Sequence, residues 1–273
     1  MFSRFARHYI TNATELPFEP ADYSRFKFGD GRLAHAFGRE LGKAFVDGYG
    51  ALLLNEAEVV LVPSPYDAIP TASYAMAQAF GQEVNCFLYR HGRKTLLQSK
   101  IHRYKTYTED YGNLSAAARL QLISSDTYHL DKFFLGGRLV LFLDDICITG
   151  SHETVIRQQV EKAGITGRFM FLYYAMLQNE SIAPDFENYL NYYDMTGMEQ
   201  IVTLWRQPGY AMNTRVIKYI LKSEPADLHY FLPQASDAQL QQLVHYAVGN
   251  NYHLLDDYRN NLNIIIKFIQ YGN

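Results

Sequence analysis

The sequence is poor in cysteine and has neither a long apolar run nor a surplus of positive charge. Its 273 residues include two cysteines, Cys86 and Cys147, too few for the disulfide framework of a small secreted domain. No apolar stretch reaches the roughly 20 residues that span a bilayer. The amino-terminal residues also lack the unbroken apolar segment of a signal peptide. We therefore expect a cytoplasmic protein that does not associate with a membrane.

The charge balance argues against nucleic acid as a partner. The chain has 25 Lys and Arg against 28 Asp and Glu, a formal net charge of −3. Binding to a nucleic-acid backbone usually needs a broad positive field, so we expect no nucleic-acid partner. Hydrophobic residues make up 48% and charged residues 19% of the chain, which is typical of a folded protein.

The middle of the chain alternates short β-rich runs with helical patterns. This alternation predicts an α/β fold in which helices flank a parallel central sheet. The predicted strands are Glu58–Val62, Val84–Tyr89, Arg138–Leu143 and Arg168–Ala175. The predicted helices are Pro70–Phe80, Leu114–Ile123 and Ser151–Ala163. The polar, basic stretch Arg90–Gly112 lacks a clear periodicity and is predicted to be a long mobile loop.

The C-terminal part of the chain has purely helical patterns. Asn213 is predicted to cap one helix, and Ser236 with Gln239 forms a capping box for another. The apolar stripes of these helices need a partner surface, which is either the α/β core or a second subunit. A homodimer is therefore one of the two arrangements that the sequence allows. We expect three parts: an N-terminal segment (1–48), a core (49–180) and a helical extension packed on it (181–273).

The strongest functional pattern is Leu139–Glu153 (LVLFLDDICITGSHE). An apolar strand ends at two carboxylates, and a run of small residues then leads into a helix. In open parallel sheets, ligands bind where the carboxyl ends of strands meet the amino ends of helices. A helix start offers unpaired N–H groups and the positive end of the dipole, both of which favour a phosphate. Gly150 lets the backbone approach an anion, and Thr149 and Ser151 add hydroxyl groups.

The two carboxylates, Asp144 and Asp145, can accept hydrogen bonds from sugar hydroxyls or from hydrated Mg²⁺. A bare pair of aspartates is also compatible with a simple strand end, and Ser151 with a simple helix cap. The whole combination is more specific and favours a site for a phosphorylated sugar. The chain has neither the GxxxxGK[ST] phosphate loop nor the aspartate-x-aspartate spacing of haloacid-dehalogenase-type phosphatases at this place.

The segment DDICITGSH resembles the phosphoribosyl-pyrophosphate signature of type I phosphoribosyltransferases. The resemblance implies that Asp144 and Asp145 contact the ribose hydroxyls, with Mg²⁺ held indirectly, and that the following loop wraps the 5′-phosphate. The implied phosphate cradle consists of Cys147, Ile148, Thr149, Gly150, Ser151 and His152. Ile148 stands where the family usually has Thr or Asp, and it removes a polar side chain that assists the nucleophilic base in some members. His152 replaces the usual Thr and can still donate to a phosphate.

Three other segments resemble the ComF-like subgroup of these enzymes. They are Ser24–Leu41, Val59–Phe80 and Arg93–Lys105. With the loop, the resemblance covers about residues 20–180. It is closest to the ComF-like transferases found beside bacterial tellurium-resistance stress genes, and this resemblance implies a role in making a nucleoside-like metabolite. The Asp144 loop is the most specific of these motifs.

The same resemblance implies that pyrophosphate binds at the loop after the first core strand. The residues at that place are Ser64, Pro65, Tyr66 and Asp67. Family members often carry Arg or Lys in this loop, and this chain does not. Basic residues from the following polar stretch are therefore expected to approach it, namely Arg93, Lys100 and Arg103. The alternative is that this stretch is only a solvated basic loop.

The resulting functional hypothesis is Mg²⁺-dependent phosphoribosyl transfer. The enzyme would move 5-phosphoribose from phosphoribosyl pyrophosphate to a nitrogen nucleophile, a base or base-like small molecule, and release pyrophosphate. The alternative is a non-catalytic regulator that senses phosphoribosyl pyrophosphate or a nucleotide through the same loop, because Ile148 and the pyrophosphate loop depart from the family pattern. A purely structural role would leave the Asp144–Ser151 arrangement unexplained. No His/Asn partnership supports Cys147 as a nucleophile.

Overall fold

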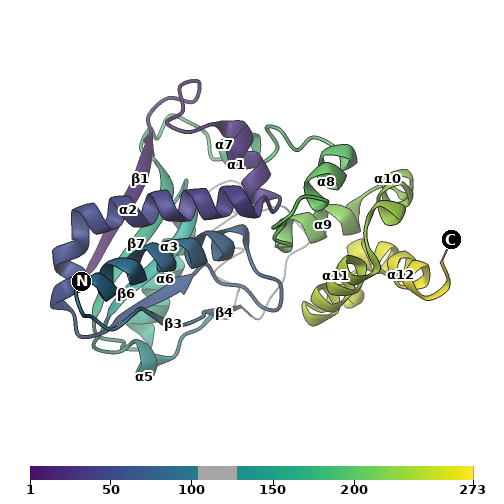
Figure 1. The fold of residues 1–273 in the computed structure, drawn as a ribbon. Coiled ribbons are helices and arrows are strands. Elements are labelled where there is room, and N and C mark those ends of the chain that lie inside the picture. Colours follow the sequence, from purple (N-terminus) through teal and green to yellow (C-terminus); the bar gives the residue numbers. More distant parts are fainter. Residues whose placement is uncertain (104–127, 273) are drawn as a thin grey trace.

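A five-stranded parallel sheet forms the centre of the molecule in the computed structural model, which describes residues 1–103 and 128–272 (Figure 1). Its strands are β1 (Phe2–Ile10), β2 (Val59–Pro63), β3 (Leu97–Gln98), β6 (Leu139–Cys147) and β7 (Arg168–Leu177). They lie in the order β1-β7-β6-β2-β3, and each neighbouring pair is parallel. A separate antiparallel pair consists of β4 (His102–Arg103) and β5 (Tyr128–His129). The predicted α/β class is confirmed.

Helices cover both faces of this sheet. They are α1 (Pro20–Lys27), α2 (Gly31–Asn55), α3 (Ala72–Arg90), α5 (Lys132–Leu135), α6 (Ser151–Lys162) and α7 (Phe186–Asn191). Side chains alternate along a strand, so Leu141 and Leu143 of β6 join the core under α2 and α3. Val140 and Phe142 point the other way and join the core under α6. Because both faces of β6 are covered, its sequence is apolar without alternation.

Helix α3 corrects one prediction. The predicted strand Val84–Tyr89 is the second half of this helix, which begins two residues after Pro70 and continues through Gly81 to Arg90. Val84 and Leu88, one helical turn apart, are both buried, so the apolar run fits a helix face as well as a strand. A Cβ at Gly81 would lie 3.4 Å from the Leu61 side chain, so the glycine allows close packing on β2 and does not end the helix.

The other three predicted strands are present as β2, β6 and β7. Strand β6 continues four residues past the predicted end at Leu143, so Asp144 and Asp145 lie within the strand, which pairs with β7 as far as Cys147. Strand β1, at the edge of the sheet, was not predicted, and β3 lies inside the stretch expected to be a loop. The predicted helix Leu114–Ile123 and the part of that loop after Arg103 lie outside the described residues.

The helical extension has a core of its own and stands beside the sheet in Figure 1. Its elements are α8 (Met198–Trp205), α9 (Thr214–Lys222), α10 (Pro225–Phe231), η2 (Leu232–Gln234), α11 (Asp237–Gly249), η3 (Tyr252–Leu254) and α12 (Asp256–Tyr271). The predicted Asn213 cap and the Ser236–Gln239 capping box are both present. Phe28 and Ile69 of the α/β part are buried in this core, so the extension packs on the sheet domain.

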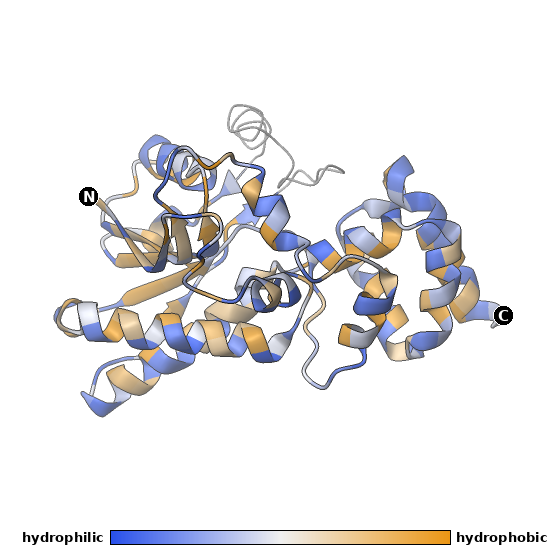
Figure 2. Ribbon diagram, turned by 90° about the horizontal axis from the view of Figure 1, so that it is seen from above, coloured by the Kyte–Doolittle hydropathy of each residue, from blue (hydrophilic) through white to orange (hydrophobic). Residues whose placement is uncertain are grey.

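The helices of the extension are amphipathic. Figure 2 shows hydrophobic and hydrophilic stretches alternating along them. The inner face of α9 is fully buried, as its pattern predicts, and consists of Val216, Ile217, Ile220 and Leu221. Among the helices of the described ranges, none combines the length and the apolarity that crossing a membrane requires.

Candidate functional site

The two carboxylates at the end of β6 point to opposite faces of the sheet, because neighbouring side chains of a strand alternate. Asp145 faces α1 and is 5% exposed. It accepts a hydrogen bond from the Tyr23 hydroxyl at 2.6 Å and forms an ion pair with the Lys27 ammonium. Both partners lie about one turn apart on α1. The first helix of the chain therefore fixes the orientation of Asp145.

Burial and neighbouring charges act against one another at Asp145. Burial raises its pKa, Lys27 lowers it, and the adjacent Asp144 raises it again, with a result of about 6. The ion pair with Lys27 favours the ionised carboxylate. Sequence reasoning missed Lys27 as a partner of Asp145, although it lies in the segment Ser24–Leu41 that carries the family resemblance.

Replacement of Lys27 tests this electrostatic balance. Lys27→Met removes the cation and keeps the length of the side chain, so the pKa of Asp145 should rise by about one unit or more. An NMR titration that follows the carboxyl carbon of Asp145 measures this pKa directly. Lys43→Met, at an exposed position on α2, is the control and should leave the midpoint unchanged. The same midpoint in the Lys27 variant and the parent would show that Lys27 does not set the charge of Asp145.

Asp144 faces the opposite side and is held by three different groups. Its Oδ1 accepts from the Ser64 hydroxyl at 2.5 Å and from the Asp145 backbone N–H at 2.9 Å. Its Oδ2 lies 3.4 Å from Nδ1 of His152. Burial opposes ionisation, but His152 and these hydrogen bonds keep the pKa of Asp144 below its usual value. Asp144 is therefore ionised across the neutral range and links β2 to the start of α6.

The turn between β6 and α6 has the geometry of an anion site. Gly150 adopts a left-handed conformation, with φ +70°, and caps α6. Such a conformation is readily available only to glycine. The hydroxyls of Thr149 and Ser151 lie 2.7 Å apart, directly at the helix start. These two hydroxyls and the positive end of the helix dipole therefore meet at the start of α6.

A buried carboxylate lies in the first turn of α6, where it would repel an anion if left uncompensated. Glu153 is 2% exposed and accepts from Nε of Arg4 on β1 at 2.8 and 3.0 Å. It also pairs with Arg157 at 2.5 Å and accepts from the Tyr173 hydroxyl at 2.9 Å. One carboxylate therefore meets two guanidinium groups. Sequence reasoning missed this cluster because Arg4 and Tyr173 lie 149 and 20 positions from Glu153 along the chain.

Two further residues of the predicted phosphate cradle, Cys147 and Ile148, contact the apolar cores on the two faces of the sheet. Cys147 is buried, and burial followed by the charge of Glu153 raises the pKa of its thiol to about 11. A protonated thiol is a poor nucleophile, in agreement with the expectation from sequence. Ile148 packs against the apolar core under α2 and α3.

A cavity of about 640 Å³ brings these groups together. The sequence-predicted residues that line it are Ser64, Pro65, Arg103, Asp144, Asp145, Cys147, Ile148, Thr149, Gly150, Ser151 and His152. Its opposite wall comes from the C-terminal part of the chain and includes Tyr192, Arg215, Lys218, Tyr219 and Lys222. The cavity therefore lies between the sheet and the helical extension, as expected for a ligand site between two structural units.

The residues predicted for pyrophosphate are only partly brought together. Tyr66 and Asp67 line a smaller cavity of about 60 Å³, which Arg103 also borders. Lys100 donates to the Asp67 carbonyl oxygen at 2.5 Å and lies 4.0 Å from the Tyr66 ring centre, beside a different cavity. Arg93 donates to the carbonyl oxygen of Glu56, before the amino end of β2. The structure thus places Arg93 at the opposite end of β2 from Ser64.

The carboxylate pair suits a metal ion that arrives with its ligand. Within residues 1–103 and 128–272, no cluster of three or more His, Cys, Asp or Glu side chains could hold a metal ion. Mg²⁺ usually keeps several waters and binds one or two carboxylates together with substrate phosphates. Asp144 and Asp145 could fill the protein's part of such a coordination sphere, directly or through water.

A model of the ComF-like phosphoribosyltransferase family matches residues 1–265. This match covers nearly the whole chain, and the chain belongs to this family. No curated protein sequence matches it significantly.

Several solved structures are similar to the chain. A hypoxanthine phosphoribosyltransferase from Staphylococcus aureus is 11% identical, covers 61% of this chain and 79% of its own, and has a TM-score of 0.33. A hypoxanthine-guanine phosphoribosyltransferase from Schistosoma mansoni in complex with IMP is 11% identical (55% and 68% covered, TM-score 0.34). A purine phosphoribosyltransferase from Pyrococcus horikoshii is 17% identical (52% and 77% covered, TM-score 0.29).

Proposed function

We propose that the protein transfers 5-phosphoribose from phosphoribosyl pyrophosphate to a small nitrogen nucleophile. A C1–N bond forms on the sugar while the C1–O bond to pyrophosphate breaks. The electron pair of that bond leaves with pyrophosphate, and the nitrogen loses its proton to water or a base. The transition state resembles a sugar cation with a departing anion, so electrostatic positioning supplies most of the catalysis.

One observation carries this proposal. Asp144 and Asp145, near the carboxyl end of β6, and the Gly150 turn at the start of α6 line one cavity. A phosphorylated sugar needs this combination, because its hydroxyls donate to carboxylates while its phosphate accepts from N–H and O–H groups. Membership of the ComF-like phosphoribosyltransferase family supports the same ligand.

Each group then has a defined task. The backbone of the turn and the hydroxyls of Thr149 and Ser151 bind the 5′-phosphate. Asp144 and Asp145 orient the ribose hydroxyls, with Ser64 and Lys27 holding the carboxylates in place. When Mg²⁺ is bound beside these carboxylates, it neutralises part of the pyrophosphate charge.

The acceptor would enter from the side of the helical extension. The rings of Tyr192 and Tyr219 line the cavity there, and both contact Phe28 edge-on, at 5.5 and 5.6 Å between centroids. Aromatic side chains can pack against a planar nitrogenous ring. A base or base-like molecule is therefore the acceptor class that we propose.

Binding of phosphoribosyl pyrophosphate should depend on Mg²⁺. A divalent cation held by Asp144 and Asp145 would reduce the repulsion between pyrophosphate and these two carboxylates, so the affinity should rise about tenfold or more when it is added. Calorimetric titration with and without Mg²⁺ measures this, and ribose 5-phosphate, which lacks pyrophosphate, serves as the control with a much smaller metal effect. No binding of either ligand under either condition would exclude this function and the regulatory one alike.

A second candidate function is supported by the surroundings of Ile148 and Cys147. The hydrocarbon side chain of Ile148 lines the cavity and has no group that can accept a proton. The raised pKa keeps the Cys147 thiol protonated, so neither side chain can act as a base near the sugar. A regulator that binds phosphoribosyl pyrophosphate or a nucleotide without turning it over needs no such group. Release of pyrophosphate distinguishes it from the enzyme.

A further inference from the structure

The helical extension holds the loop that follows β2. Oδ1 of Asn250, at the end of α11, accepts from the backbone N–H groups of Ala68 and Ile69 at 2.8 and 3.0 Å. The Thr214 hydroxyl, at the start of α9, donates to the carbonyl oxygens of Ile69 and Pro70 at 3.1 and 3.2 Å. The backbone N–H of Thr214 also donates to the Pro70 oxygen at 3.0 Å. Two helices of the extension thus fix the carboxyl end of the Ser64–Asp67 loop.

Lys218 extends this contact toward the interior of the site. It follows Thr214 by four residues on α9, so both side chains lie on one face of the helix. Lys218 lines the 640 Å³ cavity together with Ser64 and Asp144. It also lines the 60 Å³ cavity together with Tyr66 and Asp67. Its position is therefore between the carboxylate pair and the loop after β2.

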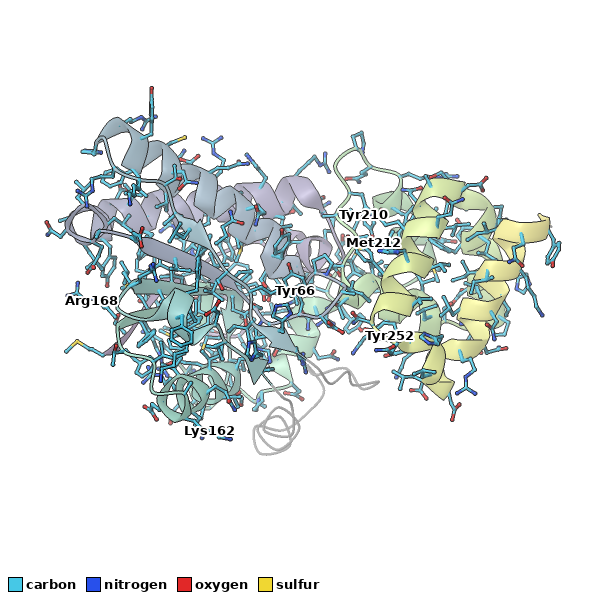
Figure 3. All side chains as sticks on the ribbon, turned by 90° about the horizontal axis from the view of Figure 1, so that it is seen from below. Tyr66, Lys162, Arg168, Tyr210, Met212 and Tyr252 are labelled. Atoms are coloured by element: carbon cyan, nitrogen blue, oxygen red, sulfur yellow. The ribbon has the colours of Figure 1, made fainter. Side chains whose placement is uncertain are left out.

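The two cavities share the residues around this loop. The residues that line both are Pro65, Thr71, Arg103, Thr214 and Lys218. Tyr66 on the loop and Tyr252 on the extension border the smaller cavity, and Figure 3 shows Tyr66 between the sheet and the helices that carry Tyr252.

Charges of both signs surround this place. Burial raises the pKa of the Tyr252 hydroxyl, a hydrogen bond with Asn250 and the charge of Arg103 lower it, and the charge of Asp67 raises it. Arg103 and Asp67 therefore both lie within electrostatic reach of Tyr252. The loop itself carries one acidic residue, Asp67, and no Lys or Arg. Two cations from other segments, Arg103 and Lys218, line the small cavity together with the loop residues Tyr66 and Asp67.

We propose that Lys218, on the helical extension, binds the pyrophosphate group of phosphoribosyl pyrophosphate opposite the Ser64–Asp67 loop, with Arg103 beside it. The inference rests on the phosphoribosyl-pyrophosphate site proposed above. Pyrophosphate remains anionic with one Mg²⁺ bound, and an ammonium group that reaches the loop from α9 supplies the charge that the loop lacks. The extension is then a structural part of the binding site, and its contacts through Asn250 and Thr214 set the distance between Lys218 and the loop.

The test is a calorimetric comparison of Lys218→Gln with the parent, using Mg²⁺-pyrophosphate and ribose 5-phosphate as separate ligands. The variant should bind pyrophosphate about tenfold or more weakly, the effect of one lost charged hydrogen bond, and ribose 5-phosphate within about twofold of the parent. Lys218→Arg keeps the charge and should retain most of the affinity. The matched control is Lys267→Gln, an exposed position on α12, which should bind both ligands like the parent.

Each outcome separates this inference from the proposed function. If the parent binds both ligands and Lys218→Gln binds pyrophosphate equally well, Lys218 is not part of the site and the proposed function stands. If Lys218→Gln loses both ligands equally while its melting temperature is unchanged, the assignment to the pyrophosphate end is wrong. If the parent binds neither ligand, the proposed function fails and this inference with it.

Discussion

Gly150→Val is expected to abolish binding of ribose 5-phosphate and of phosphoribosyl pyrophosphate. Gly150 has φ +70°, where an L-residue costs about 1–2 kcal/mol, and a β-branched side chain there disfavours the conformation that directs the N–H groups at the phosphate. The nearest atoms to an added Cβ would be 3.8 Å away on Arg4 and 4.0 Å away on Cys147. The fold therefore has room for the Cβ atom of the valine. The expected effect of the substitution is loss of anion binding at the turn.

A second glycine provides the control for backbone strain. Gly137, just before β6, has φ +76°, and a Cβ there would meet no atom within 4 Å. Gly137→Val should thus lose a similar amount of stability and keep full affinity for ribose 5-phosphate in calorimetry. Free pyrophosphate should bind both variants much like the parent, because the proposed pyrophosphate subsite is at the other loop. Equal affinity of Gly150→Val and Gly137→Val for ribose 5-phosphate would remove the turn from the site.

The parts of the structure that the sequence predicted are those encoded over short distances. The apolar run of β6, the glycine turn and the start of α6 follow one another directly, and so do Ser236 and Gln239 of the capping box. In each case the residues that determine the conformation lie within a few positions of one another. The position of the proposed phosphate site belongs to this group, because it needs only the end of one strand and the start of the next helix.

The partners of the site residues could not be predicted in this way. Lys27 and Asp145 are 118 positions apart, and Arg4 and Glu153 are 149 positions apart. No sequence pattern indicates either pair. Each pair becomes visible only when α1 and the edge strand β1 have been placed on the sheet. The same holds for Lys218, whose place beside the loop depends on how the extension packs around Phe28 and Ile69.

Two errors in secondary structure had local causes. The run VNCFLY in α3 is rich in residues that favour strands, but packing of Val84 and Leu88 on the sheet outweighs this preference. Strand β1 mixes Arg4, Arg7 and His8 with its apolar residues, since an edge strand is only partly covered. Its pairing with β7 places Arg4 beside the first turn of α6, where it compensates Glu153.

Asp144→Asn should reduce turnover strongly without unfolding the protein. The asparagine oxygen can still accept from Ser64, but the charge proposed to orient the ribose hydroxyls is lost. A charged hydrogen bond contributes about 1.5–3 kcal/mol, so the loss should be about tenfold or more. Asp144 is the cleaner position to change, because Asp145→Asn would leave Lys27 buried without its carboxylate, at a further cost in stability. Asp47→Asn, exposed on α2, is the matched control and should behave like the parent.

Time-dependent release of pyrophosphate from phosphoribosyl pyrophosphate tests the central claim most directly. The protein is incubated with Mg²⁺ and a panel of bases and small nitrogen nucleophiles. We expect release that requires one of these nucleophiles, is about tenfold or more slower in Asp144→Asn, and is absent in Gly150→Val. Binding of phosphoribosyl pyrophosphate with no release above the protein-free rate, whichever nucleophile is present, would contradict the transferase and support the sensing regulator.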